Sequence, residues 1–263
     1  MTSKPVVLCL SGLDPSGGAG IQADIEAISY QGCHPTAVIT ALTVQDTRNV
    51  QHFECVDAQL ILRQARTVLN DMKVNAIKIG MLGSVAIADA IHCLLREYPQ
   101  IPVILDPILA AGGGSSLSTS HLIDAINKLI LPYTFITTPN TIEARRLAAC
   151  AETIDRQLVI ECIAQTGVKH ILLTGTHAST QEVEHHLYRG SEHLQSFQYQ
   201  RLPGEYHGSG CTLAASLAAF IARQTEIVQA SQQALDYTYQ SLTHAHAPGT
   251  GQLVPDRSFR AEP

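Results

Sequence analysis

The residues best suited to chemistry lie in two glycine-rich segments, of which Gly208-Ser209-Gly210-Cys211 has the more specific pattern. It stands directly before small apolar residues that predict a helix over residues 211–223. Its two glycines let the backbone approach an anion, the free amides of the first helical turn point toward it, and the helix dipole adds about half a positive charge. Such a nest suits a phosphoryl group whose negative charge spreads during transfer.

Cys211 has two interpretations, and its position leaves both open. In the first helical turn, the field of the helix lowers the pKa of a thiol and favours the thiolate. Alternatively, Cys211 is a small buried side chain without chemistry, which is the expected role of the other six cysteines of the chain.

The other glycine-rich segment, residues 12–20, follows a predicted strand and precedes a predicted helix, so its amides face the carboxyl edge of a sheet, where ligands bind. Its first and sixth residues have the spacing of a P-loop, but Gly18 stands where that motif requires Lys, which argues strongly against it. Residues 18–23 fit the dinucleotide-binding pattern of dehydrogenases, although the acidic residue this pattern needs could only be Asp46, which comes late. A tight turn that binds no ligand is the remaining alternative.

Polar side chains stand at or just beyond the ends of two predicted strands. Asp106 precedes Pro107, and Asn140 and Glu143 fall on one side of a helix predicted to begin near Thr141. All three could approach a cation at the carboxyl edge, and a Mg²⁺ ion held mainly through water and phosphate oxygens needs only one or two carboxylates. The alternative is local structure, because Asn140 with Glu143 resembles a capping box and Asp-Pro favours a turn.

The elements that must position these residues alternate between short apolar runs and longer helical patterns, which is typical of parallel strands joined by crossover helices. Strands are predicted at residues 6–10, 37–43, 76–79, 103–106, 135–138 and 171–174, with an antiparallel pair at 183–189 and 194–200. Helices are predicted from Ile21 to a stop at Gly32, near 60–72, 87–98, 122–130 and 142–150, and over 211–223 and 225–241. Near-continuous apolar strands belong to a sheet covered on both faces. We therefore predict a single α/β domain over residues 1–263, a three-layer α-β-α sandwich with a central, mostly parallel sheet and a loop-like tail over 249–263.

Composition excludes several classes of protein. With 45% hydrophobic and 15% charged residues among 263, the chain is expected to fold around a large core. A net charge of −6 and 5% aromatic residues argue against nucleic-acid binding. The longest apolar run, residues 213–222, is half of the ~20 residues that a membrane span requires.

Cysteine and histidine patterns give no metal signature. The seven cysteines are scattered without a C-x-x-C pair, which favours a cytoplasmic protein without a disulfide framework or structural zinc. His207 is predicted to be a surface histidine, and the pair His185-His186 lacks the spacing of metal ligands.

Six ordered stretches together resemble the hydroxymethylpyrimidine/phosphomethylpyrimidine kinases of thiamine biosynthesis, a branch of the ribokinase-like superfamily. The stretches are residues 11–24, 38–45, 78–82, 105–107, 138–144 and 207–212, and the resemblance extends from Ser11 to about Arg223. It implies ATP-dependent phosphorylation of 4-amino-5-hydroxymethyl-2-methylpyrimidine and then of its monophosphate to the diphosphate, with Mg²⁺. It also implies a cytoplasmic homodimer whose partners are this pyrimidine and ATP, with neither nucleic acid nor membrane.

The same resemblance assigns roles to individual residues. Cys211 would take the proton of the substrate's hydroxymethyl group, while the amides of Gly208, Ser209 and Gly210 would stabilise the transferred charge. The residues implied to contact the pyrimidine are Gly12, Ala19, Asp24, Gln45 and Met81. Those implied to organise the phosphates and nucleotide are Asn140, Thr174 and Gly175, with Asp106 and Glu143 at Mg²⁺. The amide of Gln45 can both donate and accept toward an aminopyrimidine edge, and Met81 offers an adaptable apolar contact.

The chain departs from the family pattern where two lysines are common. The family shows Lys-Ser-Gly after the Asp-Pro segment and Lys-Gly-Gly-His near the fifth long strand, whereas this chain has Gly112-Gly113-Gly114-Ser115 and Thr174-Gly175-Thr176-His177. The segment over residues 202–206 also differs. We therefore expect a weaker second phosphorylation, with backbone donors compensating at the glycine run. The alternatives are a pyridoxal or pyridoxine kinase of the same superfamily and a pyrimidine-binding protein that has lost turnover.

Overall fold

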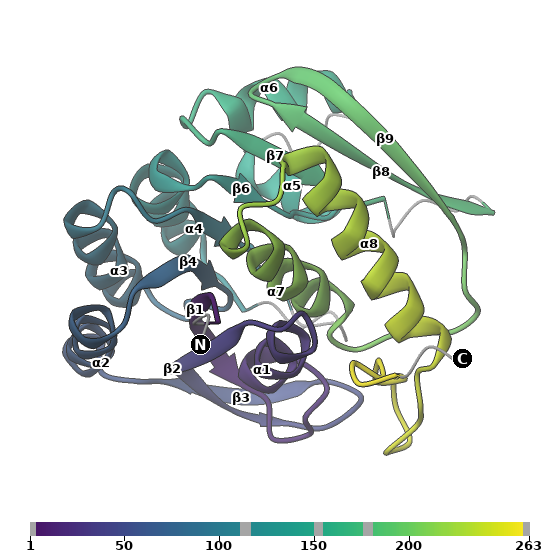
Figure 1. The fold of residues 1–263 in the computed structure, drawn as a ribbon, viewed down its shortest axis with the longest axis horizontal. Coiled ribbons are helices and arrows are strands. Elements are labelled where there is room, and N and C mark those ends of the chain that lie inside the picture. The colour runs from purple at the N-terminus through teal and green to yellow at the C-terminus, as the bar shows by residue number, and fades with distance from the viewer. Residues whose placement is uncertain (1–3, 111–116, 150–154, 176–180, 260–263) are drawn as a thin grey trace.

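One large sheet organises the structure, a computed structural model that describes residues 4–110, 117–149, 155–175 and 181–259. The described residues form nine strands in the order β3-β2-β1-β4-β5-β6-β7-β8-β9 (Figure 1). The strands are β1 (Val6–Leu13), β2 (His34–Gln45), β3 (Val50–Cys55), β4 (Val74–Ile79), β5 (Val103–Leu105), β6 (Ile136–Thr137), β7 (His170–Leu173), β8 (Glu182–Arg189) and β9 (Glu192–Gln200). The six strands from β2 to β7 in this order are parallel to one another. At the two edges, β3 pairs antiparallel with β2, β8 with β7, and β9 with β8. The predicted mostly parallel sheet is confirmed.

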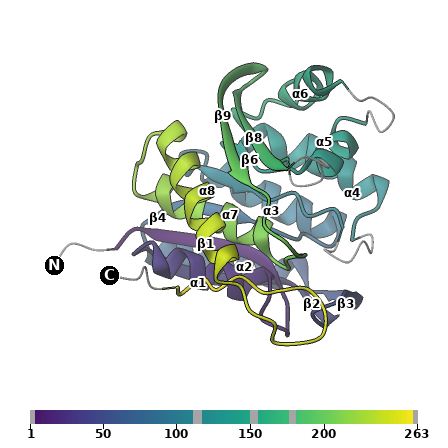
Figure 2. The same ribbon diagram turned by 90° about the vertical axis from the view of Figure 1, so that its right-hand side faces the viewer.

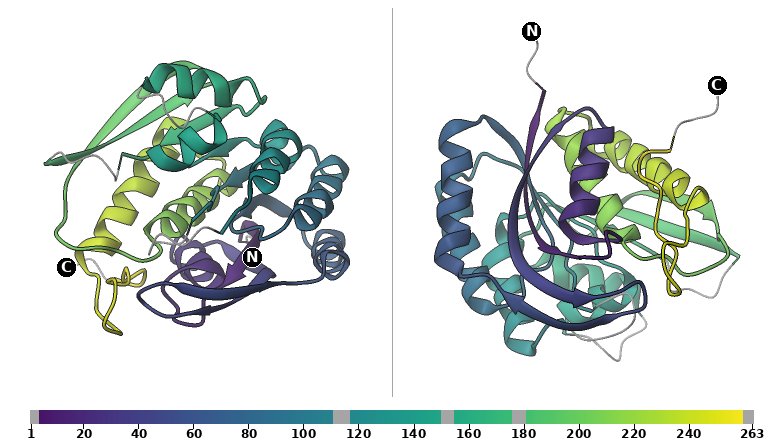
Figure 3. Two further views of the ribbon diagram at one scale, coloured as in Figure 1. Left: turned by 180° about the vertical axis from the view of Figure 1, so that it is seen from behind. Right: turned by 90° about the horizontal axis from the view of Figure 1, so that it is seen from below.

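Helices cover both faces of this sheet, as Figures 1 and 3 show from opposite sides. One face carries α1 (Gly20–Tyr30), α7 (Ser209–Ala222) and α8 (Ile227–Thr243). The other carries α2 (Ala58–Asp71), α3 (Val85–Glu97), α4 (Ser120–Ala125), α5 (Thr141–Leu147) and α6 (Arg156–Ala164). The predicted three-layer sandwich is therefore confirmed.

The central strands are apolar on both sides because both sides are covered. In β1, Leu8 and Leu10 pack into the core under α2 and α3, while Val7 and Cys9 pack into the core under α1 and α7. None of these four side chains is exposed. Burial on both faces removes the alternation of polar and apolar residues that a half-exposed strand shows.

Helix α7 is the most deeply buried helix described. Every residue from Cys211 to Ala222 is buried, and α7 packs between α1 and α8. Its many alanines let neighbouring backbones approach closely, so the position of its first turn at the sheet's carboxyl edge is set by packing along the whole helix.

Some elements differ from the sequence prediction. Strand β3 and helix α6 were not predicted, and the helix predicted over 122–130 is α4 followed by a π-helical turn, Ile126–Ile130. Strand β3 lies at the sheet edge with only Val50 buried, so it lacks the apolar run used to recognise the other strands. The helix predicted over 142–150 is α5, which ends earlier, at Leu147, with Ala148 as its C-cap; Cys150 lies outside the described residues.

The tail after Pro248 contains no helix or strand as far as Phe259, in line with the predicted loop. It nevertheless pairs with the body, because Leu253 bridges Tyr206 and Val254 bridges His246. Figure 2 shows it passing beside α1 and the end of the β2–β3 hairpin. No helix among the described residues is long and apolar enough to span a membrane.

Candidate active site

The carboxyl ends of the parallel strands gather the predicted site residues from distant parts of the chain. Gly12 and Gln45 lie at the ends of β1 and β2, and Asp106 directly follows β5. Asn140, which begins α5, bridges Thr174 just beyond β7. These strands belong to the parallel part of one sheet, so residues that are far apart in the sequence face one edge.

The predicted amide nest lies at the start of α7. Gly208 is the N-cap residue with φ of 83° and provides no capping side chain, so the first-turn amides of Ser209, Gly210 and Cys211 have no side-chain cap. A Cβ at Gly208 would overlap the carbonyl oxygen of Gly18, and φ in this region disfavours other residues. A Cβ at Gly210 would lie 3.8 Å from Oδ1 of Asp106, so the nest and this carboxylate are neighbours.

Of the two interpretations of Cys211, a thiolate and a buried thiol, the surroundings of the side chain favour the thiol. Cys211 is 6% exposed, and burial together with the Asp106 carboxylate raises the pKa of its thiol to about 12. Lys78 and the amide of Gly20 act in the opposite direction but do not compensate. Desolvation and the neighbouring carboxylate therefore favour the thiol form of Cys211 at neutral pH.

Asp106, which is buried, and Glu143, which is partly buried, are neighbouring carboxylates. Burial raises the pKa of Asp106, and burial together with Asp106 raises the pKa of Glu143 to about 8. Oδ2 of Asp106 has no hydrogen-bond partner among the described residues. An unpartnered carboxylate oxygen beside a second carboxylate fits a divalent cation such as Mg²⁺, which needs few protein ligands. The described residues contain no cluster of three or more His, Cys, Asp or Glu side chains able to hold a metal.

The alternative role of Asn140 and Glu143 in capping α5 is also present. Oδ1 of Asn140 accepts from the amides of Ile142 and Glu143, both at 2.9 Å, and Oε2 of Glu143 accepts from the Asn140 amide at 2.9 Å. This is a complete capping box. The Glu143 carboxylate also accepts from the amide of Leu109. Its two oxygens together offer about four lone-pair sites, so capping and metal binding are compatible.

The residues predicted to contact the pyrimidine are only partly brought together. Gly12 leaves room for Met81, whose Sδ would lie 3.3 Å from a Cβ at position 12. Ala19 lies at the start of α1 and its amide donates to Asp14 at 2.8 Å. Asp24 is fully buried, and its Oδ1 lies 2.8 Å from Nζ of Lys78 in an ion pair. Oδ2 of Asp24 also accepts from Oγ of Ser11 at 2.6 Å, so the structure engages this carboxylate with Lys78 and Ser11.

Lys78 is a buried group that the sequence analysis overlooked. Its ammonium lies in β4 with no exposure and donates to Oγ of Ser11 at 3.1 Å and to Oδ2 of Asp24 at 3.0 Å. Asp24 raises the pKa of Lys78 against the opposing effect of burial. A lysine between Ile77 and Ile79 in a buried parallel strand is the signal that could have revealed it, because an unpaired charge there is very costly.

His207, predicted as a surface histidine, is buried instead, with 7% exposure. Its Nε2 lies 2.7 Å from Oδ2 of Asp14 and 2.8 Å from the side-chain amide nitrogen of Gln45. Burial acts to raise the pKa of Asp14, but hydrogen bonds with His207 and Ser16 outweigh it and lower that pKa. His207 thus joins the first glycine loop to the end of β2, which contains Gln45.

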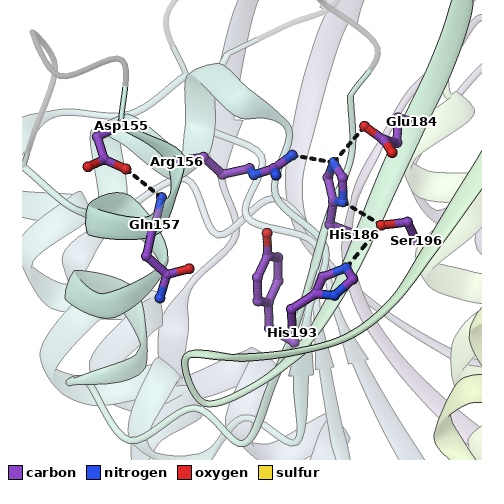
Figure 4. A pocket seen from close by; sticks show the side chains of 8 residues that line it. Asp155, Arg156, Gln157, Glu184, His186, His193 and Ser196 are labelled. Carbon is purple, nitrogen blue, oxygen red and sulfur yellow. Dashed lines mark hydrogen bonds and ion pairs between the residues drawn. The ribbon is translucent and has the colours of Figure 1, made fainter.

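A separate polar pocket of about 390 Å³ lies between α6 and the β8–β9 hairpin (Figure 4). In it, Nδ1 of His186 lies 2.9 Å from Oγ of Ser196, which also lies 2.9 Å from Nε2 of His193. None of the predicted site residues lines this pocket. The departures at 112–115 and 176–177 lie outside the described residues, whereas Thr174 is described and its amide donates to the Pro139 carbonyl at 2.9 Å.

Comparison with solved structures establishes the class of fold. The structure of an ADP complex of Bacillus subtilis pyridoxal kinase superposes with a TM-score of 0.88 at 24% identity, covering 97% of this chain and 98% of that one. The chain therefore has the fold of this kinase. The phosphomethylpyrimidine kinase from Clostridium difficile 630 superposes with a TM-score of 0.78 at 29% identity, covering 91% of this chain and all of that one.

Sequence comparison gives the family. A profile of the phosphomethylpyrimidine kinase family matches residues 14–256, so the chain belongs to this family. The hydroxymethylpyrimidine/phosphomethylpyrimidine kinase of Rhizobium meliloti is 32% identical over 252 residues, which cover 94% of each chain. Other curated relatives are longer, and the chain spans about half of their length, between 45% and 53%.

Proposed function

We propose that the protein transfers the γ-phosphoryl group of ATP to the hydroxymethyl group of 4-amino-5-hydroxymethyl-2-methylpyrimidine, and then phosphorylates the monophosphate to the diphosphate. The proposal rests on one observation. The α7 amides that have no side-chain cap lie next to the Asp106–Glu143 pair at one edge of the sheet. This donor set suits a γ-phosphate with its cation. Membership of the family supports the choice of substrate.

In this proposal the amides of Ser209, Gly210 and Cys211 hold the phosphoryl group as its charge spreads. Mg²⁺, when bound by Asp106 and Glu143, supplies positive charge to the phosphate oxygens. Gly12 and Met81 border the pyrimidine, and the side-chain amide of Gln45 forms hydrogen bonds with its polar edge.

The proton of the hydroxymethyl group needs an acceptor that is consistent with a Cys211 thiol. Cys211 contacts Asp106 through a side-chain hydrogen bond. As the substrate oxygen bonds to the γ-phosphorus and ADP leaves, the hydroxyl proton moves to the sulfur and the thiol proton moves to Asp106. In a loose transition state the hydroxyl proton leaves late, so a preformed thiolate is not required.

Incubation of the purified protein with ATP, Mg²⁺ and the pyrimidine, followed by mass measurement of the products, tests the proposal. We expect the monophosphate first and the diphosphate more slowly, because the two family lysines are absent. Absence of both products would refute the function. A higher kcat/KM on pyridoxal would assign the related kinase activity, and tight pyrimidine binding without ATP consumption would assign a binding protein.

The proposal also includes a cytoplasmic homodimer without nucleic-acid or membrane partners. Light scattering of the purified protein measures the mass of the assembly, and a mass near the 28.3 kDa of one chain would contradict the dimer.

A further inference from the structure

The segment that follows α8 folds back over the candidate active site. The amide of Gln252 donates to the carbonyl of Thr47 at 2.8 Å, in the turn after β2. The amide of Leu253 donates to Glu205 at 2.9 Å, and the amide of His207 donates to Leu253 at 2.8 Å. The segment therefore connects the hairpin that carries Gln45 with the residues leading into the amide nest.

Arg257, near the end of this segment, inserts a buried guanidinium between the two glycine loops. It is 2% exposed. Its Nε donates to Oγ1 of Thr212 at 2.8 Å, one Nη donates to Oε2 of Glu26 at 3.1 Å, and the other donates to the carbonyl of Gly18. One side chain thus binds α7, α1 and the first glycine loop.

The two glycine-rich loops, residues 12–20 and 208–211, contact each other at the carbonyl of Gly18. A Cβ at Gly208 would overlap this oxygen, and a Cβ at Gly18 would overlap the ring of His207. Oγ1 of Thr212 in turn donates to the carbonyl of Gly208 at 2.8 Å. A continuous set of hydrogen bonds therefore runs from Gly18 through Arg257 and Thr212 to the N-cap of α7.

We propose that Arg257 is a positioning residue for phosphoryl transfer, which fixes the loop that holds the acceptor against the amides that hold the phosphoryl group. The proposal rests on the function proposed above. The family match ends at residue 256, so family membership assigns no role to Arg257. Because reacting atoms must approach in a narrow range of geometry, a shift of one loop against the other by about 1 Å would slow transfer strongly.

The geometry of these three hydrogen bonds fits arginine and not lysine. The guanidinium directs its donors along three fixed directions, toward Thr212, Glu26 and Gly18, whereas a lysine ammonium is a single nitrogen on a flexible stem. Glu26 is the carboxylate that pairs with Arg257 among the described residues, and 39% of its side chain is exposed. Thr212 belongs to the first turns of α7, so the guanidinium lies beside the start of that helix.

The test compares Arg257→Gln and Arg257→Lys with the full-length wild type. As matched control we use Arg66→Gln, which removes an exposed pair with Glu97 on the surface of α2 and α3. We expect both Arg257 variants to lose roughly ten- to hundredfold in kcat/KM for the pyrimidine, through lower kcat and higher KM. The dissociation constant for ADP should stay near that of the wild type, because the adenosine and the remaining phosphates do not depend on the acceptor loop.

Hydrogen exchange provides a readout that does not require turnover. In Arg257→Gln, the amides of residues 16–20 and 209–212 should exchange faster, with the rest of the sheet core unchanged. If the wild type phosphorylates nothing, the proposed function fails while this measurement still decides the role of Arg257. Unchanged exchange in both loops, unchanged kcat/KM, or an activity loss matched by uniformly faster exchange across the chain would overturn the positioning role.

Discussion

At the scale of single residues, the buried ion pair of Lys78 and Asp24 gives the clearest stability prediction. Lys78→Met removes the only cation within hydrogen-bonding distance of Asp24 in the described structure and leaves a buried carboxylate unpaired. We expect the free energy of unfolding to fall by about 3–5 kcal/mol in urea titrations. The double variant with Asp24→Asn should recover much of the loss, because no unpaired charge remains. Equal destabilisation of single and double variants would contradict the ion pair as the cause.

The thiol of Cys211 gives a prediction for activity. Cys211→Ala should retain pyrimidine binding, measured by calorimetry, and lose roughly 10²-fold or more in kcat, because proton transfer to a positioned group contributes about that factor. The wild-type thiol should also react slowly with alkylating reagents at neutral pH, since burial and Asp106 raise its pKa to about 12. A Cys211→Ala enzyme with full activity would remove this side chain from the mechanism.

At the scale of elements, the first turn of α5 combines two roles that substitutions can separate. Glu143→Gln preserves the capping box, because glutamine can accept from the Asn140 amide in the same way, but it removes the carboxylate that would bind Mg²⁺. We expect unfolding free energy to change little and the Mg²⁺ concentration for half-maximal activity to rise. Glu143→Ala, the matched variant, should also lose the hydrogen bond from the Asn140 amide, with a stability cost of about 1 kcal/mol. An unchanged Mg²⁺ requirement in Glu143→Gln would leave capping as its sole role.

The elements that sequence predicts well are those whose burial is uniform. Strands β1, β4 and β7 are buried along almost their whole length and were predicted, although β1 extends to Leu13, into the glycine-rich segment. Strand β3 was missed because its pairing with β2 at the sheet edge leaves its side chains largely exposed. Helix α6 was missed because a nine-residue helix with three buried side chains gives too few periodic positions.

At the scale of the whole molecule, the candidate site was predictable where its residues lie in local motifs. Gly208, Asn140 and Glu143 are recognisable from their immediate neighbours, and they occur where expected. The burial of His207 depends on Asp14, 193 residues away, and that of Arg257 depends on Gly18, 239 residues away. Such partners are determined by tertiary packing, which local sequence does not encode.

The pH dependence of stability is also a property of the whole fold, and His185 of β8 provides its acid limit. His185 is 8% exposed, and its ring contacts Tyr199 of β9 at 5.8 Å between centroids. Burial, assisted by the neighbouring His186, lowers the pKa of His185 from 6.5 to about 4. Between these values the unfolded chain binds a proton that the folded chain does not, so the unfolding free energy falls as pH falls from about 6.5 to 4, by on the order of 3 kcal/mol.

Glu143 makes the unfolding free energy fall as pH rises, which is opposite to the effect of His185. Its pKa is about 8 in the folded protein and about 4.5 in the unfolded chain, so the unfolded chain loses this proton first as pH rises. The measurement is therefore a difference, the unfolding free energy of wild type minus that of His185→Gln at each pH, in which the contribution of Glu143 cancels. We expect this difference to decrease steadily from about pH 6.5 to 4 and to be constant above pH 7. Parallel profiles of the two proteins across the acid range would show that His185 is not the group whose burial opposes protonation.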